Sequence, residues 1–164
     1  MKEKNGEHPF GDTGQMILFV LFMIVWTADS FWLEISTFPA ASIHLFIRII
    51  IAAVALVLGL MLAKSGHVVA GEENDPGGVV SSGAFGYVRH PLYLGSILFY
   101  VCLTVFTASL VSLGVLVVIF VFYNYIAGYE EKLLELRYGG EYTHYKRDTG
   151  KWVPKVWKVR SKAS

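Results

Sequence analysis

Four long apolar segments constrain the fold of this chain more than any other feature. They run from about Met16 to Leu33, Ile43 to Ala63, Leu92 to Thr107 and Leu110 to Ala127. A helix needs roughly 20 mostly apolar residues, with a range of about 17 to 25, to cross the hydrocarbon core of a bilayer. The segments therefore predict an all-α, polytopic membrane protein with about four transmembrane helices.

The last two apolar segments form a predicted helical hairpin. Only residues 107–109 separate them, so the start of the third helix and the end of the fourth must be neighbours. The third segment is short for a span. We expect it either to begin at Pro91 within the headgroup region or to tilt within the hairpin.

The basic residues predict the orientation. Lys64 and Arg89 lie between the second and third segments, nine of the 14 basic residues follow the fourth, and the two short external turns carry none. Because basic loops stay in the cytoplasm, we expect both termini and the central loop to be cytoplasmic. The net charge of +1 gives no indication of nucleic-acid binding.

We interpret the whole chain, 1–164, as a single membrane domain. Its predicted parts are a polar N-terminal segment (1–15), two spans (16–63), a cytoplasmic loop (64–90), the hairpin (91–127) and a cytoplasmic C-terminal helical segment (128–164). In the last part, the helix of the fourth span is expected to continue to Tyr138 and to stop at Gly139. Trp152 is expected to anchor the chain at the membrane interface.

The sequence Arg89-His90-Pro91 stands directly before the third span. Proline is favoured at the first position of a helix and moves the preceding residue out of the α region. His90 is therefore predicted to be an extended cap residue, outside a helix N-terminus whose amides favour an anion.

Two carboxylates, Glu130 and Glu131, end the fourth span, and the hairpin brings them to Arg89 and His90. These charges could simply form salt bridges and reach toward the headgroups. A cation pair opposite a carboxylate pair also suits a small zwitterion such as an amino acid. Its carboxylate would bind Arg89, His90 and the helix amides, and its ammonium would bind a glutamate.

Two motifs at this spacing are similar to those of a known superfamily. They are Ser82-Gly83-x-Phe85-x-Tyr87-Val88-Arg89-His90-Pro91-x-Tyr93-x-Gly95 and Glu130-Glu131-x-Leu133-x-x-x-Tyr138-Gly139-x-Glu141-Tyr142-x-x-Tyr145, followed by Pro154. Together they resemble the isoprenylcysteine carboxyl methyltransferase and phospholipid methyltransferase superfamily over about residues 79–154. The resemblance implies an integral membrane methyltransferase that uses S-adenosylmethionine and takes a lipophilic acceptor from the bilayer.

The resemblance also implies roles for individual residues. Cofactor binding falls on Gly83, Tyr87, His90, Tyr93, Leu94, Glu130 and Glu131, and catalysis falls on Arg89 and Glu131. Tyr87 and Tyr93 would face the sulfonium through their ring quadrupoles. Arg89 would orient the nucleophile or the cofactor carboxylate, and Glu131 would act as a base if the acceptor is a protonated amine. No spacing typical of a metal site occurs.

Departures from the pattern leave alternatives open. Superfamily members that methylate prenylcysteine often carry an arginine in the last turn before the glutamate pair, and residues 124–129 carry no cation here. The sequence is also similar to NADPH-dependent sterol reductases, although Leu92 and Ser96 depart from their pattern. A third interpretation is a non-enzymatic scaffold that binds membrane lipids. Asp29 and Arg48, near the external ends of the first two spans, are expected to pair.

Overall fold

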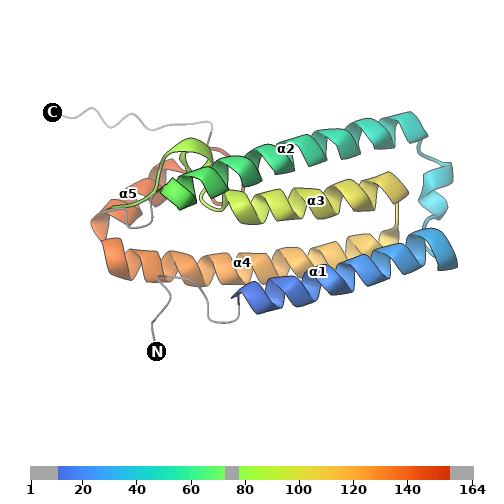
Figure 1. The fold of residues 1–164 in the computed structure, drawn as a ribbon, viewed down its shortest axis with the longest axis horizontal. Helices are drawn as coiled ribbons and strands as arrows, with labels where there is room; N and C mark the ends of the chain where they lie inside the picture. The colour runs from blue at the N-terminus through green and yellow to red at the C-terminus, as the bar shows by residue number, and fades with distance from the viewer. Residues whose placement is uncertain (1–10, 73–77, 156–164) are drawn as a thin grey trace.

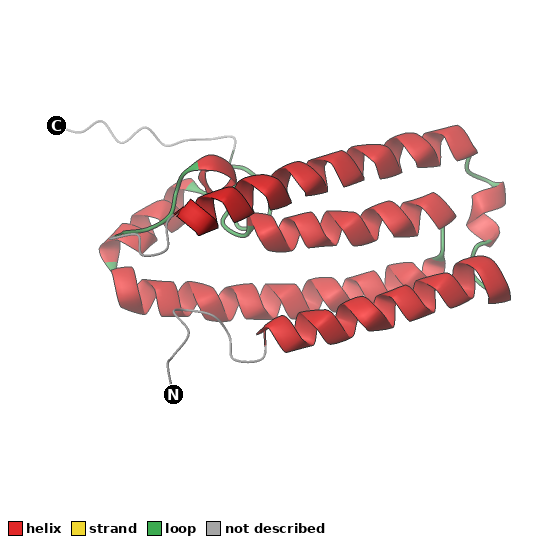
Figure 2. Ribbon diagram, viewed as in Figure 1, coloured by secondary structure: helices red, strands yellow, loops and turns green. Residues whose placement is uncertain are grey.

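The computed structural model describes residues 11–72 and 78–155, and the regular structure within these ranges is almost entirely helical (Figure 2). The elements in chain order are α1 (Gly11–Thr27), the π-helix η1 (Ala28–Leu33), the 3-10 helix η2 (Phe38–Ala41), α2 (Leu45–Glu72), the 3-10 helix η3 (Gly83–Gly86), α3 (Pro91–Thr107), α4 (Leu110–Tyr138) and α5 (Gly140–Asp148). The predicted all-α class is confirmed for the described residues.

The four long helices lie along a common axis, with α1 beside α4 and α2 beside α3 (Figure 1). We call the end that holds the α3–α4 connection the turn end, and the opposite end the α5 end. Within the described ranges, three helical stretches are long and apolar enough to cross a membrane, namely Gly11–Leu33, Leu45–Gly66 and Leu110–Tyr138. The apolar helix α3 is shorter, at 17 residues.

The hairpin of α3 and α4 follows from its end residues. Pro91 occupies the start of α3, and His90 before it is non-helical, with φ −126° and ψ 65°. At the turn end, Ala108 adopts a left-handed conformation with φ 54°. Ser109 then caps α4, and its side chain accepts a hydrogen bond from the amide of Ser112 at 3.0 Å.

Two helices extend beyond the predicted spans. The helix α1 begins at Gly11 within the predicted polar segment, and α2 continues to Glu72, which shortens the predicted loop of residues 64–90. No proline occurs between Lys64 and Glu72 to stop the helix. Gly66 fits there because its missing side chain leaves room for Leu92, whose Cδ2 would lie 2.7 Å from an added Cβ. Residues 73–77 of that loop lie outside the described ranges.

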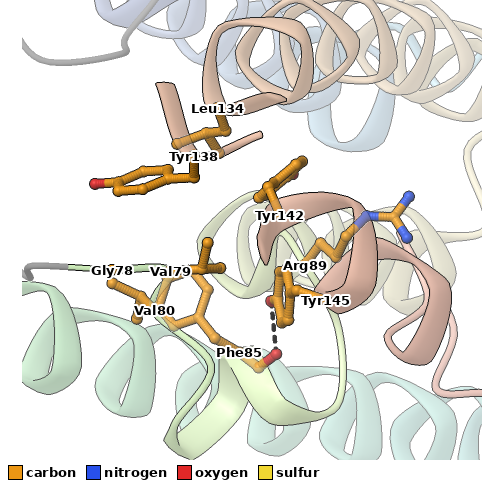
Figure 3. A pocket seen from close by; sticks show the side chains of 9 residues that line it. All are labelled: Gly78, Val79, Val80, Phe85, Arg89, Leu134, Tyr138, Tyr142 and Tyr145. Carbon is orange, nitrogen blue, oxygen red and sulfur yellow. Dashed lines mark hydrogen bonds between the residues drawn. The ribbon is translucent and has the colours of Figure 1, made fainter. Parts of the chain in front are cut away.

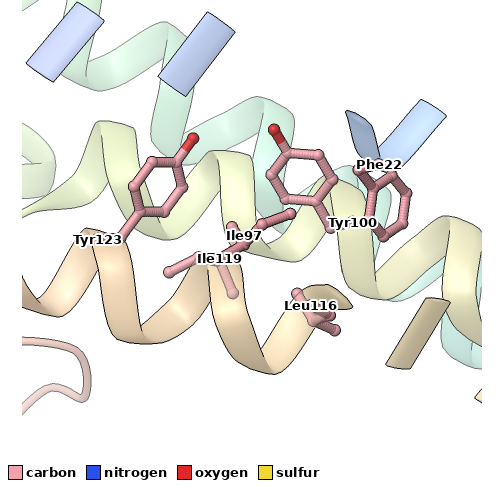
Figure 4. Close-up of a cluster of buried hydrophobic side chains, with 6 residues drawn as sticks. All are labelled: Phe22, Ile97, Tyr100, Leu116, Ile119 and Tyr123. Carbon is pink, nitrogen blue, oxygen red and sulfur yellow. The ribbon is translucent and has the colours of Figure 1, made fainter. Parts of the chain in front are cut away.

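The helices pack through a small aromatic core. Its buried members come from α1, α3 and α4, and are Phe22, Ile97, Tyr100, Leu116, Ile119 and Tyr123 (Figure 4). The helices α2 and α3 approach closely where two glycines meet, since an added Cβ on Gly95 would lie 2.9 Å from the carbonyl oxygen of Gly59. Small residues at such contacts are typical of membrane helix pairs. Many large apolar side chains elsewhere on the long helices remain exposed, as expected for a lipid-facing surface.

A buried polar network holds the turn end together. The Asp29 carboxylate accepts hydrogen bonds from the hydroxyls of Ser36 and Ser109, at 2.5 and 2.6 Å. Arg48 instead donates to the backbone carbonyl of Phe106 at 2.9 Å. The expected Asp29–Arg48 pair was therefore wrong, because nearer hydroxyls bind the Asp29 carboxylate and a carbonyl near the C-terminus of α3 accepts from Arg48 Nη1.

Candidate active site

The Arg89-His90-Pro91 segment is held at the α5 end by the chain that follows α5. The Arg89 amide donates to the carbonyl of Gly150 at 2.9 Å, and Val88 forms a parallel bridge with the same residue. Residues far apart in the sequence are thus fixed side by side. This arrangement brings the end of α4, the start of α3 and the segment after α5 to one place.

Glu131 is the centre of a buried charge cluster. Its Oε1 atom lies 3.0 Å from Arg89 Nε and 3.1 Å from His90 Nε2, and its Oε2 atom lies 3.5 Å from Lys146 Nζ. The side chains of Arg89 and Glu131 are each only 8% exposed. Such charges are costly to remove from water unless every one is paired and hydrogen-bonded. The predicted proximity of the two motifs is confirmed by these contacts.

Arg89 also binds the end of α5. Its Nη1 donates to the carbonyls of Lys146 and Thr149, at 3.1 and 2.5 Å. Cations are favoured at helix C-termini because the last carbonyls lack partners within the helix. Because its Nε also pairs with Glu131, the Arg89 guanidinium links α4, α5 and the start of α3. These contacts indicate that Arg89 positions the three elements relative to one another.

His90 is stacked within a column of aromatic rings. Its imidazole lies 5.7 Å from the Tyr93 ring at an interplanar angle of 8°, and Tyr93 stacks on Tyr123 at 5.4 Å and 14°. Trp152 lies on His90 at 5.8 Å and 41°. The Tyr93 hydroxyl donates to Glu130 Oε1 at 2.5 Å. These side-chain contacts hold the aromatic rings of the site in fixed orientations.

Burial sets the protonation state of His90. It lowers the pKa of the imidazole below its ordinary value, and the hydrogen bond and charge of Glu131 offset only part of this effect. A neutral imidazole with its hydrogen on Nε2 donates to Glu131, which leaves Nδ1 as an acceptor. His90 Nδ1 lies 3.8 Å from Glu130 Oε2.

These residues border a cavity of about 450 Å³ at the α5 end. Its walls come from α1, α2, α3, α4 and the segment before α3, and consist of Gly11, Asp12, Gln15, Ala63, Phe85, Arg89, His90, Pro91, Leu92, Tyr93, Ser96, Glu130 and Leu134. Ligand pockets typically enclose about 300 to 1,000 Å³. The cavity therefore has the size and the mixed polar lining of a small-molecule site.

A second, aromatic pocket of about 180 Å³ adjoins the main cavity (Figure 3). The two share Phe85, Arg89 and Leu134 as lining residues. The aromatic pocket is completed by Gly78, Val79, Val80, Tyr138, Tyr142 and Tyr145. The Tyr145 hydroxyl donates to the Phe85 carbonyl at 2.7 Å, and burial raises the pKa of this phenol, so it remains a neutral donor.

An apolar slot of about 260 Å³ extends from the main cavity toward the middle of the bundle. It is lined by Phe19, Leu56, Gly59, Leu60, Ala63, Gly95, Ser96, Phe99 and Tyr100, so it lies between α1, α2 and α3. Ala63 and Ser96 belong to both linings. A polar cavity at the end of the bundle and an apolar slot along its helices therefore adjoin each other at these two residues.

The residues predicted from the sequence are partly brought together. Arg89, His90, Tyr93 and Glu130 line the main cavity, and Glu131 is buried behind Arg89 and His90. The other three predicted residues lie elsewhere: Tyr87 is 68% exposed, Gly83 opens η3 with φ 54°, and the Leu94 amide donates to the His90 carbonyl.

Several residues at the site were missed by sequence reasoning. Trp152 was expected at the membrane interface, and it lies against His90 while its indole nitrogen donates to Asn124. Lys151 Nζ donates to the Asn124 carbonyl, which supplies a cation to the turn of α4 that carries none of its own. Asp12 and Gln15 of α1 were assigned to the polar N-terminal segment (1–15). The two residues are three positions apart, directly before the apolar segment. This helical spacing was the signal that the helix begins before Met16.

The fold and the site define a class: an apolar helical bundle with a charged cavity at one end of a helical hairpin. The chain belongs to the phospholipid methyltransferase family, because the model of that family matches residues 47–141, more than half of the sequence. The match contains Arg89-His90-Pro91 and the Glu130-Glu131 pair, and it confirms the superfamily resemblance. No curated protein and no solved structure matches the chain.

Proposed function

We propose that this protein transfers a methyl group from S-adenosylmethionine to a lipophilic acceptor that reaches the site from the bilayer. One observation carries the proposal: a charged and aromatic cavity, built from the two family motifs, adjoins an apolar slot between the long helices. A water-soluble acceptor would need no such slot. The family supports methyl transfer, and the geometry supports a ligand with a polar head and an apolar body.

The described residues fit the methyl donor. Glu130 offers a carboxylate to an ammonium group, and the His90 and Tyr93 side chains line the same cavity. The aromatic pocket beyond Phe85 is suited to a flat heterocycle. When bound, S-adenosylmethionine supplies a methyl group that passes to an acceptor lone pair while the carbon–sulfur electron pair stays on sulfur.

The chain's own contribution to the reaction is positioning and exclusion of water. Glu131 and Arg89 fix the wall of the cavity from behind, through contacts at 3.0 and 3.1 Å with the side chains around them. Trp152 covers His90. Methyl transfer in line depends mainly on alignment of donor and acceptor, so a rigid, buried cluster behind the cavity is what the chemistry requires.

We further propose that all four long helices span the membrane with the α5 end in the cytoplasm. A helix of 17 residues is about 26 Å long, close to the roughly 30 Å of a hydrocarbon core. The charge pattern supports the orientation, because Lys64 and Arg89 and most basic residues after Lys132 lie at the α5 end. The donor would then enter from the cytoplasm.

The test is incubation of membranes containing the protein with methyl-labelled S-adenosylmethionine, followed by identification of the labelled product. We expect label in an extractable lipophile with the wild-type protein and none above background with Glu130→Gln. The matched control is Glu135→Gln, which removes a half-buried carboxylate further along α4. Absence of labelled lipophile with a folded wild-type protein, or stabilisation by NADPH and not by S-adenosylhomocysteine, would contradict the proposal.

A further inference from the structure

Large apolar side chains stand exposed on the connection between α1 and α2, at the turn end. The connection runs through η1 and η2, and its most exposed aromatic residues are Trp32 and Phe38, at 80% and 69%. The same patch includes Phe31, Leu33 and Ile35. Contiguous exposed apolar side chains of this kind mark an interaction surface. The candidate active site lies at the α5 end, so this patch needs a separate explanation.

Several polar backbone groups of this irregular segment find their partners within the protein. The Glu34 amide donates to the Asp29 carbonyl at 2.9 Å. The Ser36 amide donates to the Asp29 carboxylate at 3.1 Å, and the Ser36 carbonyl accepts from the Leu110 amide at 3.3 Å. A loop in water leaves such groups to the solvent, whereas irregular backbone at membrane depth requires protein partners. These contacts favour a segment that lies against lipid.

Asp29 is the centre of this internal hydrogen bonding. The residue is 3% exposed, and besides the Ser36 amide its carboxylate accepts from the hydroxyls of Ser36 and Ser109. Because Ser109 caps α4, the carboxylate also ties the connection to the hairpin of α3 and α4. A buried carboxylate is tolerated when it is hydrogen-bonded. Asp29 therefore supplies to the connection the acceptor that water would supply to an exposed loop.

The length of the first membrane-crossing stretch places the patch at the membrane surface. Gly11–Leu33 has 23 residues. At about 1.5 Å per residue it is about 34 Å long, slightly more than the roughly 30 Å of a hydrocarbon core. Trp32, at the end of this stretch, falls at the boundary with the headgroups, where tryptophan is enriched. Glu34 carries the only formal charge between residues 30 and 43.

We propose that residues 30–43 lie within the membrane interface of the leaflet at the turn end, with Trp32 and Phe38 inserted among the lipids, and that Asp29 replaces water as the acceptor for this segment. The inference rests on the proposed membrane crossing of the four long helices and not on methyl transfer. Lipid is the occupant that the observations favour over a protein partner. The patch continues onto exposed apolar residues of α2 such as Phe46, and its backbone already has internal partners.

The test measures the depth of Trp32 in vesicles by fluorescence quenching. Full-length protein is reconstituted into phosphatidylcholine whose chains carry bromine near the headgroup or near the methyl end, and iodide serves as the quencher in water. The Trp32 signal is the difference between wild type and Trp32→Phe. We expect this signal to be quenched most by bromine near the headgroup and little by iodide. A signal quenched by iodide and not by either lipid would place the patch in water and overturn the inference.

The role of Asp29 is tested by the same measurement. Asp29→Ala removes the acceptor of the connection, so the Trp32 signal should move toward quenching by iodide. Ser36→Ala removes one donor to the carboxylate and should move it less in the same direction, which keeps the test usable if Asp29→Ala does not fold. Ser30→Ala is the matched control, because the Ser30 hydroxyl is buried with no hydrogen-bond partner, and it should leave the depth unchanged. An unchanged depth in both Asp29→Ala and Ser36→Ala would overturn the role of Asp29.

A reference position separates failure of this inference from failure of the proposed membrane crossing. Val57 is exposed near the middle of the membrane-crossing part of α2. In the Trp32→Phe protein, Val57→Trp should add a signal that is quenched most by bromine near the methyl end. If bromine does not quench this added signal, the membrane crossing is wrong and the inference falls with it. If Val57→Trp is quenched as expected while Trp32 responds only to iodide, the inference alone is wrong.

Discussion

Replacing Glu131 with glutamine should destabilise the protein more than any other single charge removal at the α5 end. The carboxylate contacts Arg89, His90 and Lys146 at 3.0, 3.1 and 3.5 Å, and its side chain is 8% exposed. Glutamine keeps the shape of the side chain but loses its charge. Its amide NH₂ group, itself a donor, would have to face either the donors of Arg89 and His90 or the ammonium of Lys146. Breaking a buried ion pair costs about 3–5 kcal/mol, and we take about 3 kcal/mol because glutamine keeps one acceptor.

The measurement is thermal unfolding of the purified protein in detergent, followed by circular dichroism. For a chain of this size, 1 kcal/mol shifts the midpoint by about 2–4 °C, so Glu131→Gln should lower it by about 6–12 °C. Glu135→Gln is the matched control, because it removes a 38% exposed carboxylate that pairs with the same Lys146 at 2.8 Å. An exposed pair contributes about 0.2–1 kcal/mol. Equal shifts for the two variants would refute the reasoning.

Three further predictions use the same melting assay. Burial lowers the pKa of His90 below 6.5, so below pH 6.5 the imidazole is more protonated in the unfolded chain than in the folded protein. The stability of the wild type should therefore fall as the pH drops through 6.5. His90→Gln should remove this pH dependence, and an unchanged profile in the variant would contradict the prediction. Gly95→Ala should cost about 1–3 kcal/mol because its Cβ meets a backbone carbonyl of α2 at 2.9 Å, whereas Gly114→Ala, with nothing within 4 Å, should be neutral or slightly stabilising. A double-mutant cycle of Asp29→Ala and Arg48→Ala should give a coupling below about 0.5 kcal/mol, and a larger value would indicate a direct pair.

The hairpin and the neighbouring motifs could be predicted from the sequence because they depend on local rules. Pro91 marks the start of α3, and Ala108 and Ser109 leave room only for a tight turn, so Arg89 and Glu131 had to approach each other. The expected N-cap position of His90 is confirmed, whereas its backbone, with φ −126° and ψ 65°, is non-helical but not extended as predicted. These inferences needed only chain connectivity and helix geometry.

The partners of each charge could not be predicted, because they depend on how distant elements pack. A pair of Asp29 and Arg48 was expected because both lie near the external ends of their predicted spans. In the structure, the Ser109 hydroxyl from the turn between α3 and α4 binds Asp29 instead. Trp152 carried an interfacial signal. Contacts such as the bridge of Val88 with Gly150 and the hydrogen bond of Trp152 to Asn124 bring the segment after α5 onto His90. Such contacts are set by tertiary structure and leave no periodic pattern in the sequence.

The end of α2 and the wall made by α1 were missed for a related reason. Lys64 was taken as the end of a span, although a helix can continue beyond the apolar core when no proline stops it, as α2 does to Glu72. Asp12 was assigned to the polar N-terminal segment, although α1 begins at Gly11 and places it in the cavity lining. Hydropathy indicates which residues lie within the membrane, but it does not indicate where a helix begins or ends.

The central claim is that the cavity beside His90, Tyr93 and Glu130 binds the methyl donor. The most direct measurement is calorimetric titration of purified wild-type protein and Glu130→Gln with S-adenosylhomocysteine. We predict saturable one-to-one binding to the wild type and binding weakened by about tenfold or more in the variant, since an ammonium loses its charge-assisted partner. No binding to a folded wild-type protein, or equal affinity in both proteins, would contradict the account.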